Sequence, residues 1–334
     1  LHIESKYPEM NKQFCGKLRP IQKDIKKKAI KILNKQNSVV IAAYTGCGKT
    51  ITSIYIACKI KLKTLIVISR VILIDQWIES IQKFVGDAKI QKLTSKSKLD
   101  EDADFYIINA INVPKHPHSF YKNIGTLIVD EVHLIATKVL SKSLAYILPK
   151  YNIALSATPT RSDGMDKLIH LYFGKEIIYK KLNKKHIVYK VDTKFKPDFE
   201  LNQAGKVDWD SVLRSQAGDT KRNELIIDIV KHYKSRVFLI LCKRVVQAKY
   251  LNERFKEENI DSLCLVGGKK YVKTNARVLT ATIQKCGTGF DNPRLDSLIL
   301  AGDVQEYFIQ YLGRVMRRQD VIPYIFDLVD NNGI

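Results

Sequence analysis

Two glycines, a lysine and a threonine give this sequence its clearest chemistry. They belong to the segment AYTGCGKT, the phosphate loop, which runs from residue 43 to residue 50. Glycines let backbone N–H groups approach a phosphate closely, because they carry no Cβ atom. The lysine ammonium can reach the β- and γ-phosphates of a nucleotide, and the threonine hydroxyl can bind Mg²⁺. The predicted nucleotide contacts are Thr45, Gly46, Cys47, Gly48, Lys49 and Thr50.

An acidic pair lies at the end of a second apolar run. Asp130 and Glu131 follow the residues TLIV and begin the segment DEVH. Magnesium on nucleotide phosphates prefers oxygen ligands, and a carboxylate opposite the loop can supply one. Hydrolysis also needs a group that orients and deprotonates the attacking water. We therefore assign the metal to Asp130 together with Thr50, and the role of base to Glu131.

Two further segments could complete such a site. In the first, Ser156 and Thr158 follow an apolar run and could relay hydrogen bonds between the nucleotide site and another surface. In the second, QYLGRVMRR, the spacing predicts one helix with Gln310, Arg314 and Arg317 on a shared face. Such arginines suit a phosphate whose charge grows in the transition state. The simpler alternative is a basic helix on the protein surface.

Short apolar runs alternate with helical patterns around these segments. The runs SVVIAA, TLIVI, FYIIN and TLIV are typical of strands buried on both faces of a parallel sheet. Each candidate residue follows such a run, and open α/β sheets bind ligands at the carboxyl ends of their strands. After an N-terminal extension at residues 1–17, the alternation predicts a doubly wound α/β domain over residues 18–170.

The second half repeats this alternation without a phosphate loop of its own. Residues 171–220 are lysine-rich and largely polar, which predicts a linker and the start of a second domain. Strand-like and helical patterns return over residues 221–334. The sequence therefore predicts two α/β domains in tandem, which is also the number expected from a length of 334 residues.

The formal net charge of +22 favours a polyanionic partner, most simply nucleic acid. The alternative is a set of lysines that are merely solvated. None of the six cysteines forms a CxxC pair, which argues against a zinc or disulfide framework and favours a reducing compartment. No apolar stretch approaches the roughly 20 residues that span a membrane. We expect a monomer without a membrane partner, located inside a cell, in cytoplasm or nucleoid, or in the host of a virus or phage.

The motifs occur in the order found in the superfamily 2 DExH helicases, which the chain resembles over residues 18–330. LRPIQ precedes the loop, LIVISRVILIDQW follows its helix, and TATIQKCGTGFDNPRLDSLIL lies in the second half. The general phosphate-loop pattern has glycine where this chain has Ala43, but the form AxxGxGKT is typical of superfamily 2. SATPTRSDGMDKL and GTGFDNPRLDSLILA most resemble the branch of XPB helicases, phage UvsW-type helicases and poxvirus transcript-release helicases.

The resemblance implies two tandem RecA-like domains, each a mainly parallel sheet flanked by helices, with an ATP cleft between them. It implies ATP and Mg²⁺ as cofactors, with Lys49, Asp130, Glu131, Gln310, Arg314 and Arg317 as catalytic residues. Arg19, Gln22 and Asp291 would add to the ATP contacts of the loop. The residues that would contact the nucleic-acid backbone are Ser69, Arg70, Asn109, Lys243, Arg244 and Thr282. Asn109 departs from the threonine usual in the family.

These implications predict an ATP hydrolase that acts as a nucleic-acid helicase. The branch favours forked or branched DNA over RNA, with ATP hydrolysis coupled to translocation along one strand. A double-stranded DNA translocase, or a transcript-release ATPase without processive unwinding, is the alternative. An ATP-switched nucleic-acid-binding module is a more distant one, because the predicted base and arginines suit hydrolysis.

Overall fold

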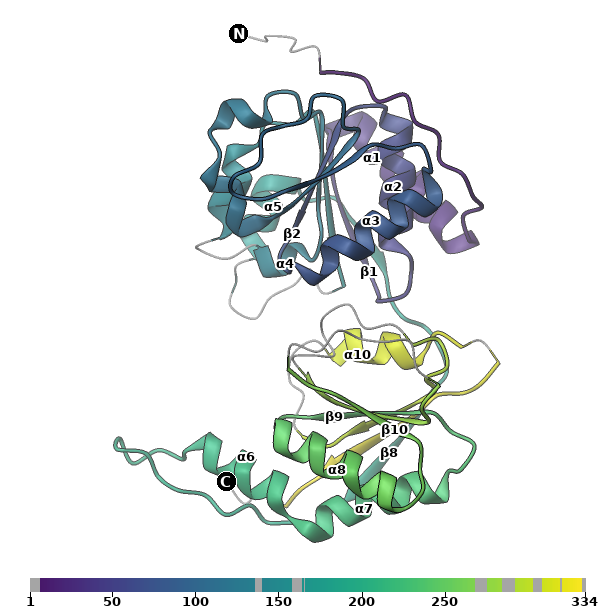
Figure 1. Cartoon of the computed structure of the whole chain (residues 1–334), viewed down its shortest axis with the longest axis vertical. Helices are drawn as coiled ribbons and strands as arrows, with labels where there is room; N and C mark the ends of the chain where they lie inside the picture. The colour runs from purple at the N-terminus through teal and green to yellow at the C-terminus, as the bar shows by residue number, and fades with distance from the viewer. Residues whose placement is uncertain are drawn as a thin grey trace. The chain divides into compact units, whose positions relative to one another are not determined.

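The chain forms two compact units, Leu1–Leu182 and Asn183–Ile334, each built on its own sheet (Figure 1). The structure is a computed structural model. It describes residues 7–135, 140–157, 164, 166–267, 275–283, 292–302, 308–318 and 320–331.

The first unit contains a seven-stranded sheet in the order β3-β4-β2-β5-β6-β1-β7, and its paired strands run parallel. Its strands are β1 (Ser38–Ala43), β2 (Thr64–Ile68), β3 (Ile90–Leu93), β4 (Phe105–Asn109), β5 (Thr126–Val129), β6 (Tyr151–Ser156) and β7 (Ile177–Lys180). Its α-helices are α1 (Pro20–Gln36), α2 (Lys49–Ile60), α3 (Ile72–Phe84), α4 (Val132–Ile135) and α5 (Asp166–Phe173). Short 3-10 helices cover Ala110–Lys115, His118–Tyr121 and Leu140–Tyr146.

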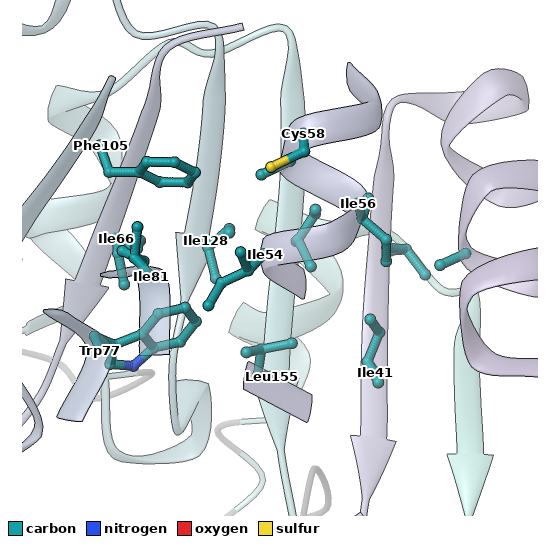
Figure 2. Close-up of a cluster of buried hydrophobic side chains, with 14 of the residues drawn as sticks. Ile41, Ile54, Ile56, Cys58, Ile66, Trp77, Ile81, Phe105, Ile128 and Leu155 are labelled. Atoms are coloured by element: carbon teal, nitrogen blue, oxygen red, sulfur yellow. The ribbon is translucent and has the colours of Figure 1, made fainter. Parts of the chain in front are cut away.

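An apolar layer joins this sheet to the helices on one of its faces. Strands β2, β4 and β5 are buried along their whole length, as their continuous apolar runs predicted. Figure 2 shows side chains of α2 and α3 packed against those of the strands. The labelled members are Ile41, Ile54, Ile56, Cys58, Ile66, Trp77, Ile81, Phe105, Ile128 and Leu155. Close packing of this kind holds the strand ends in fixed positions.

The second unit contains a six-stranded sheet in the order β10-β11-β9-β12-β13-β8, again with parallel pairing. Its strands are β8 (Ile187–Asp192), β9 (Phe238–Cys242), β10 (Ser262–Leu265), β11 (Val278–Thr282), β12 (Ser297–Leu300) and β13 (Tyr324–Val329). Its helices are α6 (Trp209–Gly218), α7 (Thr220–His232), α8 (Val245–Glu257) and α10 (Phe308–Val315). The predicted pair of mainly parallel α/β layers is confirmed.

The division between the units differs from the predicted end of the first domain at residue 170. Strand β7 pairs with β1 in the first sheet, and β8 pairs with β13 in the second, so the boundary follows Leu182. Both strands lie at sheet edges and are partly exposed. An edge strand needs no continuous apolar run, which is why neither strand was identified in the polar segment 171–220, interpreted as a linker and the start of the second domain.

A buried ion pair joins α7 to the residue that follows β13 in the second unit. Arg222 Nε donates to Asp330 Oδ1 at 2.8 Å, and Arg222 Nη1 donates to the Ala301 carbonyl at 2.7 Å. The side chains of Arg222 and Asp330 are 0% and 4% exposed. Removal of one partner leaves a buried charge unpaired, at a cost of about 3–5 kcal/mol.

We therefore expect Arg222→Met to lower the free energy of unfolding of the second unit by about 3–5 kcal/mol. Urea denaturation followed by circular dichroism measures the change. Arg214→Met is the matched control, because Arg214 makes its ion pairs on the exposed surface. If Arg222→Met unfolds at the same urea concentration as Arg214→Met, a structural role for the buried pair is contradicted.

Candidate nucleotide and nucleic-acid site

The predicted functional segments of the first unit follow strands that lie side by side in its sheet. The phosphate loop follows β1, Ser156 ends β6, and Asp130 follows β5. The register pairs Ala42 with Ser156, and Val129 with Ala154. Because all three strands are parallel, their carboxyl ends meet at one edge of the sheet. The fold thus brings the phosphate loop, the acidic pair and Ser156 together.

The phosphate loop has a conformation that depends on its glycines. Gly46 and Gly48 have φ angles of 87° and 94°, in the region that residues with a Cβ atom avoid. A Cβ atom on Gly48 would lie 2.1 Å from Gln22 Nε2 and 2.8 Å from Arg19 Nη2. Gly48 is also the N-cap of α2, so no cap side chain covers the first N–H groups of that helix. Those groups form the kind of helix N-terminus that binds phosphate.

Three long side chains contact the phosphate loop. Lys49 Nζ donates to the Ala43 carbonyl at 2.7 Å, so its side chain spans the loop and joins the two ends. Arg19 Nη2 donates to the Cys47 carbonyl at 2.7 Å. Gln22 is 2% exposed; its Oε1 accepts from the Arg19 backbone N–H at 2.7 Å, and its Nε2 donates to the Gly48 carbonyl at 3.5 Å. Arg19 and Gln22 therefore join α1 to the loop, and their contacts with adenine remain a prediction.

Asp130 is a buried carboxylate that accepts hydrogen bonds from two donors. Trp77 Nε1 donates to Asp130 Oδ2 at 2.9 Å, and the Glu131 backbone N–H donates to Oδ1 at 3.0 Å. Burial, followed by the negative charge of Glu131, raises the pKa of Asp130 to about 6. The indole of Trp77 and the charge of Lys49 oppose this rise in pKa. A cation close to the carboxylate would favour its ionised form, as expected for a metal ligand.

The donor set fits Mg²⁺ bound together with nucleotide phosphates. In the part of the chain that the structure describes, no three His, Cys, Asp or Glu residues gather as a metal cage. Mg²⁺ in nucleotide sites uses one or two carboxylates and takes its other ligands from phosphates and water. Asp130 would supply such a carboxylate, and Thr50 in the first turn of α2 would supply a hydroxyl.

The raised pKa of Asp130 predicts a pH-dependent contribution to stability. Since its folded pKa lies above the ordinary 3.8, ionisation opposes folding, and the loss of stability develops between about pH 4 and pH 7. Asp130→Asn removes this titration. Without Mg²⁺, the natural chain should lose on the order of 2–3 kcal/mol relative to the variant between pH 4 and pH 8.

Thermal denaturation of both proteins in EDTA measures this difference. An asparagine also changes the hydrogen bonds at this position, but that effect is the same at every pH. The informative quantity is therefore the change with pH in the difference between the two Tm values. A constant difference would contradict a raised pKa at Asp130.

His133 joins the acidic pair to the end of β6. Glu131 has a φ angle of 47°, a strained conformation for a residue with a Cβ atom. Its Oε2 lies 3.4 Å from His133 Nδ1, and the same nitrogen lies 2.9 Å from Ser156 Oγ. A carboxylate can only accept a hydrogen bond, so a proton on His133 Nδ1 suits this contact. His133 received no role from the sequence, although it belongs to DEVH.

The predicted nucleic-acid contacts of the first unit lie on the next two strands of the sheet. Ser69 and Arg70 follow β2, and Asn109 ends β4 beside it. Asn109 Nδ2 donates to the Ser69 carbonyl at 3.2 Å, and its Oδ1 accepts from the Ile111 N–H at 3.1 Å. The Ser69 hydroxyl is buried and has no hydrogen-bond partner among the described residues. These residues extend the polar edge that begins at the phosphate loop.

The predicted nucleic-acid contacts of the second unit also share a sheet edge. Lys243 and Arg244 follow β9, and Thr282 ends β11. These strands are neighbours, with Thr282 in register with Cys242. Arg244 forms an ion pair with Asp210 of α6, and its Nη2 donates to the Asp210 carbonyl at 3.0 Å. An incoming phosphate would compete with this carboxylate for the guanidinium.

Helix α10 contains Gln310 and Arg314 but ends at Val315. The prediction that Arg317 shares their helical face was therefore wrong. The side chain of Lys184 gives a physical reason, because its ammonium donates to the backbone carbonyls of residues 316 and 318. These bonds hold the chain in a turn where another helical turn would continue. Arg314 is 6% exposed, and Arg317 lies just beyond the helix.

Two predicted site residues, Thr158 and Asp291, lie outside the described residues, as does the side chain of Gln310. Within the described ranges, five cysteines are free, and no helix is long and apolar enough to cross a membrane. The five are Cys15, Cys47, Cys58, Cys242 and Cys264.

Comparisons with known proteins match nearly the whole chain. Residues 16–161 match the family described as Type III restriction enzyme, res subunit. A protein of Invertebrate iridescent virus 6 named as a helicase is 45% identical, over 99% of this chain and 80% of its own length. A protein of Acanthamoeba polyphaga mimivirus named as an ATP-dependent RNA helicase is 27% identical, over 97% of this chain and 66% of that protein. The transcript termination protein of Vaccinia virus is 25% identical, over 97% and 73% respectively.

The fold also matches a solved structure. A Dbp5 variant of S. cerevisiae, bound to RNA and ADP BeF3, superposes with a TM-score of 0.63 at 13% identity. The match covers 94% of this chain and 88% of that chain. At this level of identity the likeness concerns the fold, which agrees with two tandem α/β units.

Proposed function

Because this chain belongs to the superfamily 2 helicases, we propose that it uses the sheet edges described above to move along DNA at the expense of ATP. The resemblance read from its motifs is confirmed, including the relation to the poxvirus transcript termination proteins. Its class of activity is that of an ATP-dependent nucleic-acid helicase. The residue roles and the preference for DNA are the proposal.

One observation carries the assignment of the ATP site. Lys49, Asp130 and Glu131 follow two strands, β1 and β5, that are separated in the sheet only by β6. In the proposal, Lys49 and the N-terminus of α2 bind the phosphates, and Glu131 accepts the proton of the attacking water. Asp130 and Thr50 hold Mg²⁺, which neutralises phosphate charge when bound.

The second unit is proposed to supply the positive charge that hydrolysis needs. Arg314 and Arg317 are the proposed partners of the γ-phosphate, on which negative charge grows as the bond to the leaving group breaks. Their guanidinium groups remain charged at any physiological pH.

Nucleic acid is proposed to lie along the carboxyl edges of both sheets. The contacts would be Ser69, Arg70 and Asn109 in one unit, and Lys243, Arg244 and Thr282 in the other. Hydroxyl, amide and basic side chains of this kind bind the phosphate backbone and carry little sequence information. The net charge of +22 supports such a partner. The motif resemblance to branch members that act on DNA supports DNA.

Transcript release is the second candidate function. It is favoured by the 25% identity with the Vaccinia virus transcript termination protein over 97% of this chain. Such an enzyme would couple ATP hydrolysis to displacement of RNA from a transcription complex. It would need to move along DNA without processive strand separation.

ATP turnover measured with single-stranded DNA, duplex DNA, forked DNA and RNA tests the proposal. We expect each DNA to stimulate turnover more than RNA of the same sequence, and a fork to be unwound. Stronger stimulation by RNA would overturn the DNA assignment. Displacement of a triplex strand without fork unwinding would favour a double-stranded translocase or the transcript-release alternative.

A further inference from the structure

Helix α3 links the proposed nucleic-acid contacts to the proposed metal ligand within the first unit. It begins at Ile72, two residues after Arg70, and the Leu73 N–H donates to the Arg70 carbonyl at 3.0 Å. Two turns beyond Arg70, Trp77 Nε1 donates to Asp130 Oδ2 at 2.9 Å. Seven residues of helix advance about 10 Å, so one short, rigid element spans the distance.

The surroundings of Trp77 leave its indole little freedom. The side chain is 1% exposed and packs in the apolar layer beneath the sheet. Figure 2 shows the ring beside Ile66 and Ile81, with its nitrogen on the side where the strands end. An indole has a single donor, and here that donor is used on Asp130. A displacement of α3 would therefore move or release one oxygen of this carboxylate.

The residues just before α3 are also fixed by a hydrogen bond to a neighbouring strand. Asn109 Nδ2 holds the Ser69 carbonyl at 3.2 Å, which joins the ends of β2 and β4 just before the helix. The buried Ser69 hydroxyl has no hydrogen-bond partner among the described residues. A phosphate bound at Arg70 would act directly on the residues that precede α3.

We propose that Trp77 is a positioning residue that transmits nucleic-acid binding at Ser69 and Arg70 to the carboxylate of Asp130. The inference rests on the proposed function, since it takes these residues as the nucleic-acid and metal contacts. Binding of a nucleic-acid backbone fixes the first turn of α3, and the indole then holds Asp130 Oδ2 in place. A shift of α3 on binding nucleic acid would thereby change how Asp130 is held for Mg²⁺ and ATP.

Trp77→Phe tests this role because it keeps an aromatic ring in the core and removes the N–H donor, together with part of the ring volume. Trp209→Phe is the matched control, since the chain has two tryptophans and Trp209 is 61% exposed in the second unit. In Trp77→Phe we expect the Mg²⁺ concentration for half-maximal ATP turnover to rise by about 10-fold, as typical for loss of a residue that orients a ligand. We also expect most of the stimulation by DNA to be lost. Values equal to those of Trp209→Phe would overturn the proposal.

Fluorescence supplies a measurement that does not depend on turnover or on a changed core. In Trp209→Phe, Trp77 is the only tryptophan, so its emission reports on its own environment. Single-stranded DNA, added without nucleotide, should change this emission, and Arg70→Ala in the same background should remove the response. DNA that binds, as judged by the anisotropy of a labelled strand, but leaves the emission unchanged would contradict the inference.

The two failures can be told apart. If the Trp209→Phe protein neither binds DNA nor hydrolyses ATP faster in its presence, the proposed function itself fails. If DNA binds to both tryptophan variants and stimulates their turnover to the same extent, the proposed helicase function is supported and the proposed role of Trp77 is wrong.

Discussion

Lys49→Ala should reduce ATP turnover by at least about 10²–10³-fold, the usual effect of removing one group that stabilises charge in a transition state. Lys49 is the first residue of α2, and its Nζ donates to the Ala43 carbonyl at 2.7 Å. The substitution therefore removes both the cation meant for the β- and γ-phosphates and a bond across the phosphate loop. Steady-state turnover with saturating DNA measures the effect.

The same helix provides a control for this prediction. Lys59 lies in the last turn of α2 and is exposed, so Lys59→Ala changes the charge equally without touching the loop. Its turnover should match that of the natural chain. Both variants should still bind labelled DNA, because neither lysine belongs to the proposed nucleic-acid contacts. Turnover at the natural rate in Lys49→Ala would show that the phosphate loop does not take part in ATP hydrolysis.

The buried strands of both sheets could be predicted because each is a continuous apolar run that a parallel sheet requires. Val67, Ile107 and Ile128 belong to such runs, and all are fully buried. Edge strands do not follow this rule. In β8, Ile187 and Val188 are 38% and 54% exposed, and the sequence predicted a linker and the start of the second domain here without identifying this strand. What identifies β8 as a strand is its pairing with β13, which lies far along the chain.

The site could be predicted as far as its motifs extend, but the contacts that orient it could not. Trp77 fits the apolar pattern of α3, and its partner Asp130 lies 53 residues further along the chain. No local pattern shows that an indole in the core will meet that carboxylate. Arg317 illustrates the opposite error, because helical spacing was extended past the end of α10. The lysine that binds the carbonyls beyond the helix, Lys184, precedes residue 318 by 134 residues.

The second large effect is expected at Glu131. Glu131→Gln keeps the length and shape of the side chain and removes its ability to accept a proton. Loss of a general base lowers the rate of a chemical step by about 10²–10⁴-fold, so turnover should fall by that factor. The glutamine oxygen can still accept from His133 Nδ1, which lies 3.4 Å from Glu131 Oε2 in the natural chain. ATP binding should therefore be retained.

Calorimetric titration with ATP and Mg²⁺, beside steady-state turnover, separates the base from the metal ligand. Glu131→Gln should bind ATP with the Mg²⁺ dependence of the natural chain, whereas Asp130→Asn should lose that dependence. Glu79→Gln on the exposed side of α3 removes one carboxylate from the same unit and should alter neither quantity. Loss of ATP binding in Glu131→Gln would show that the carboxylate of Glu131 is needed to form the nucleotide site, through its strained backbone and its contact with His133. Its assignment as the base would then be wrong.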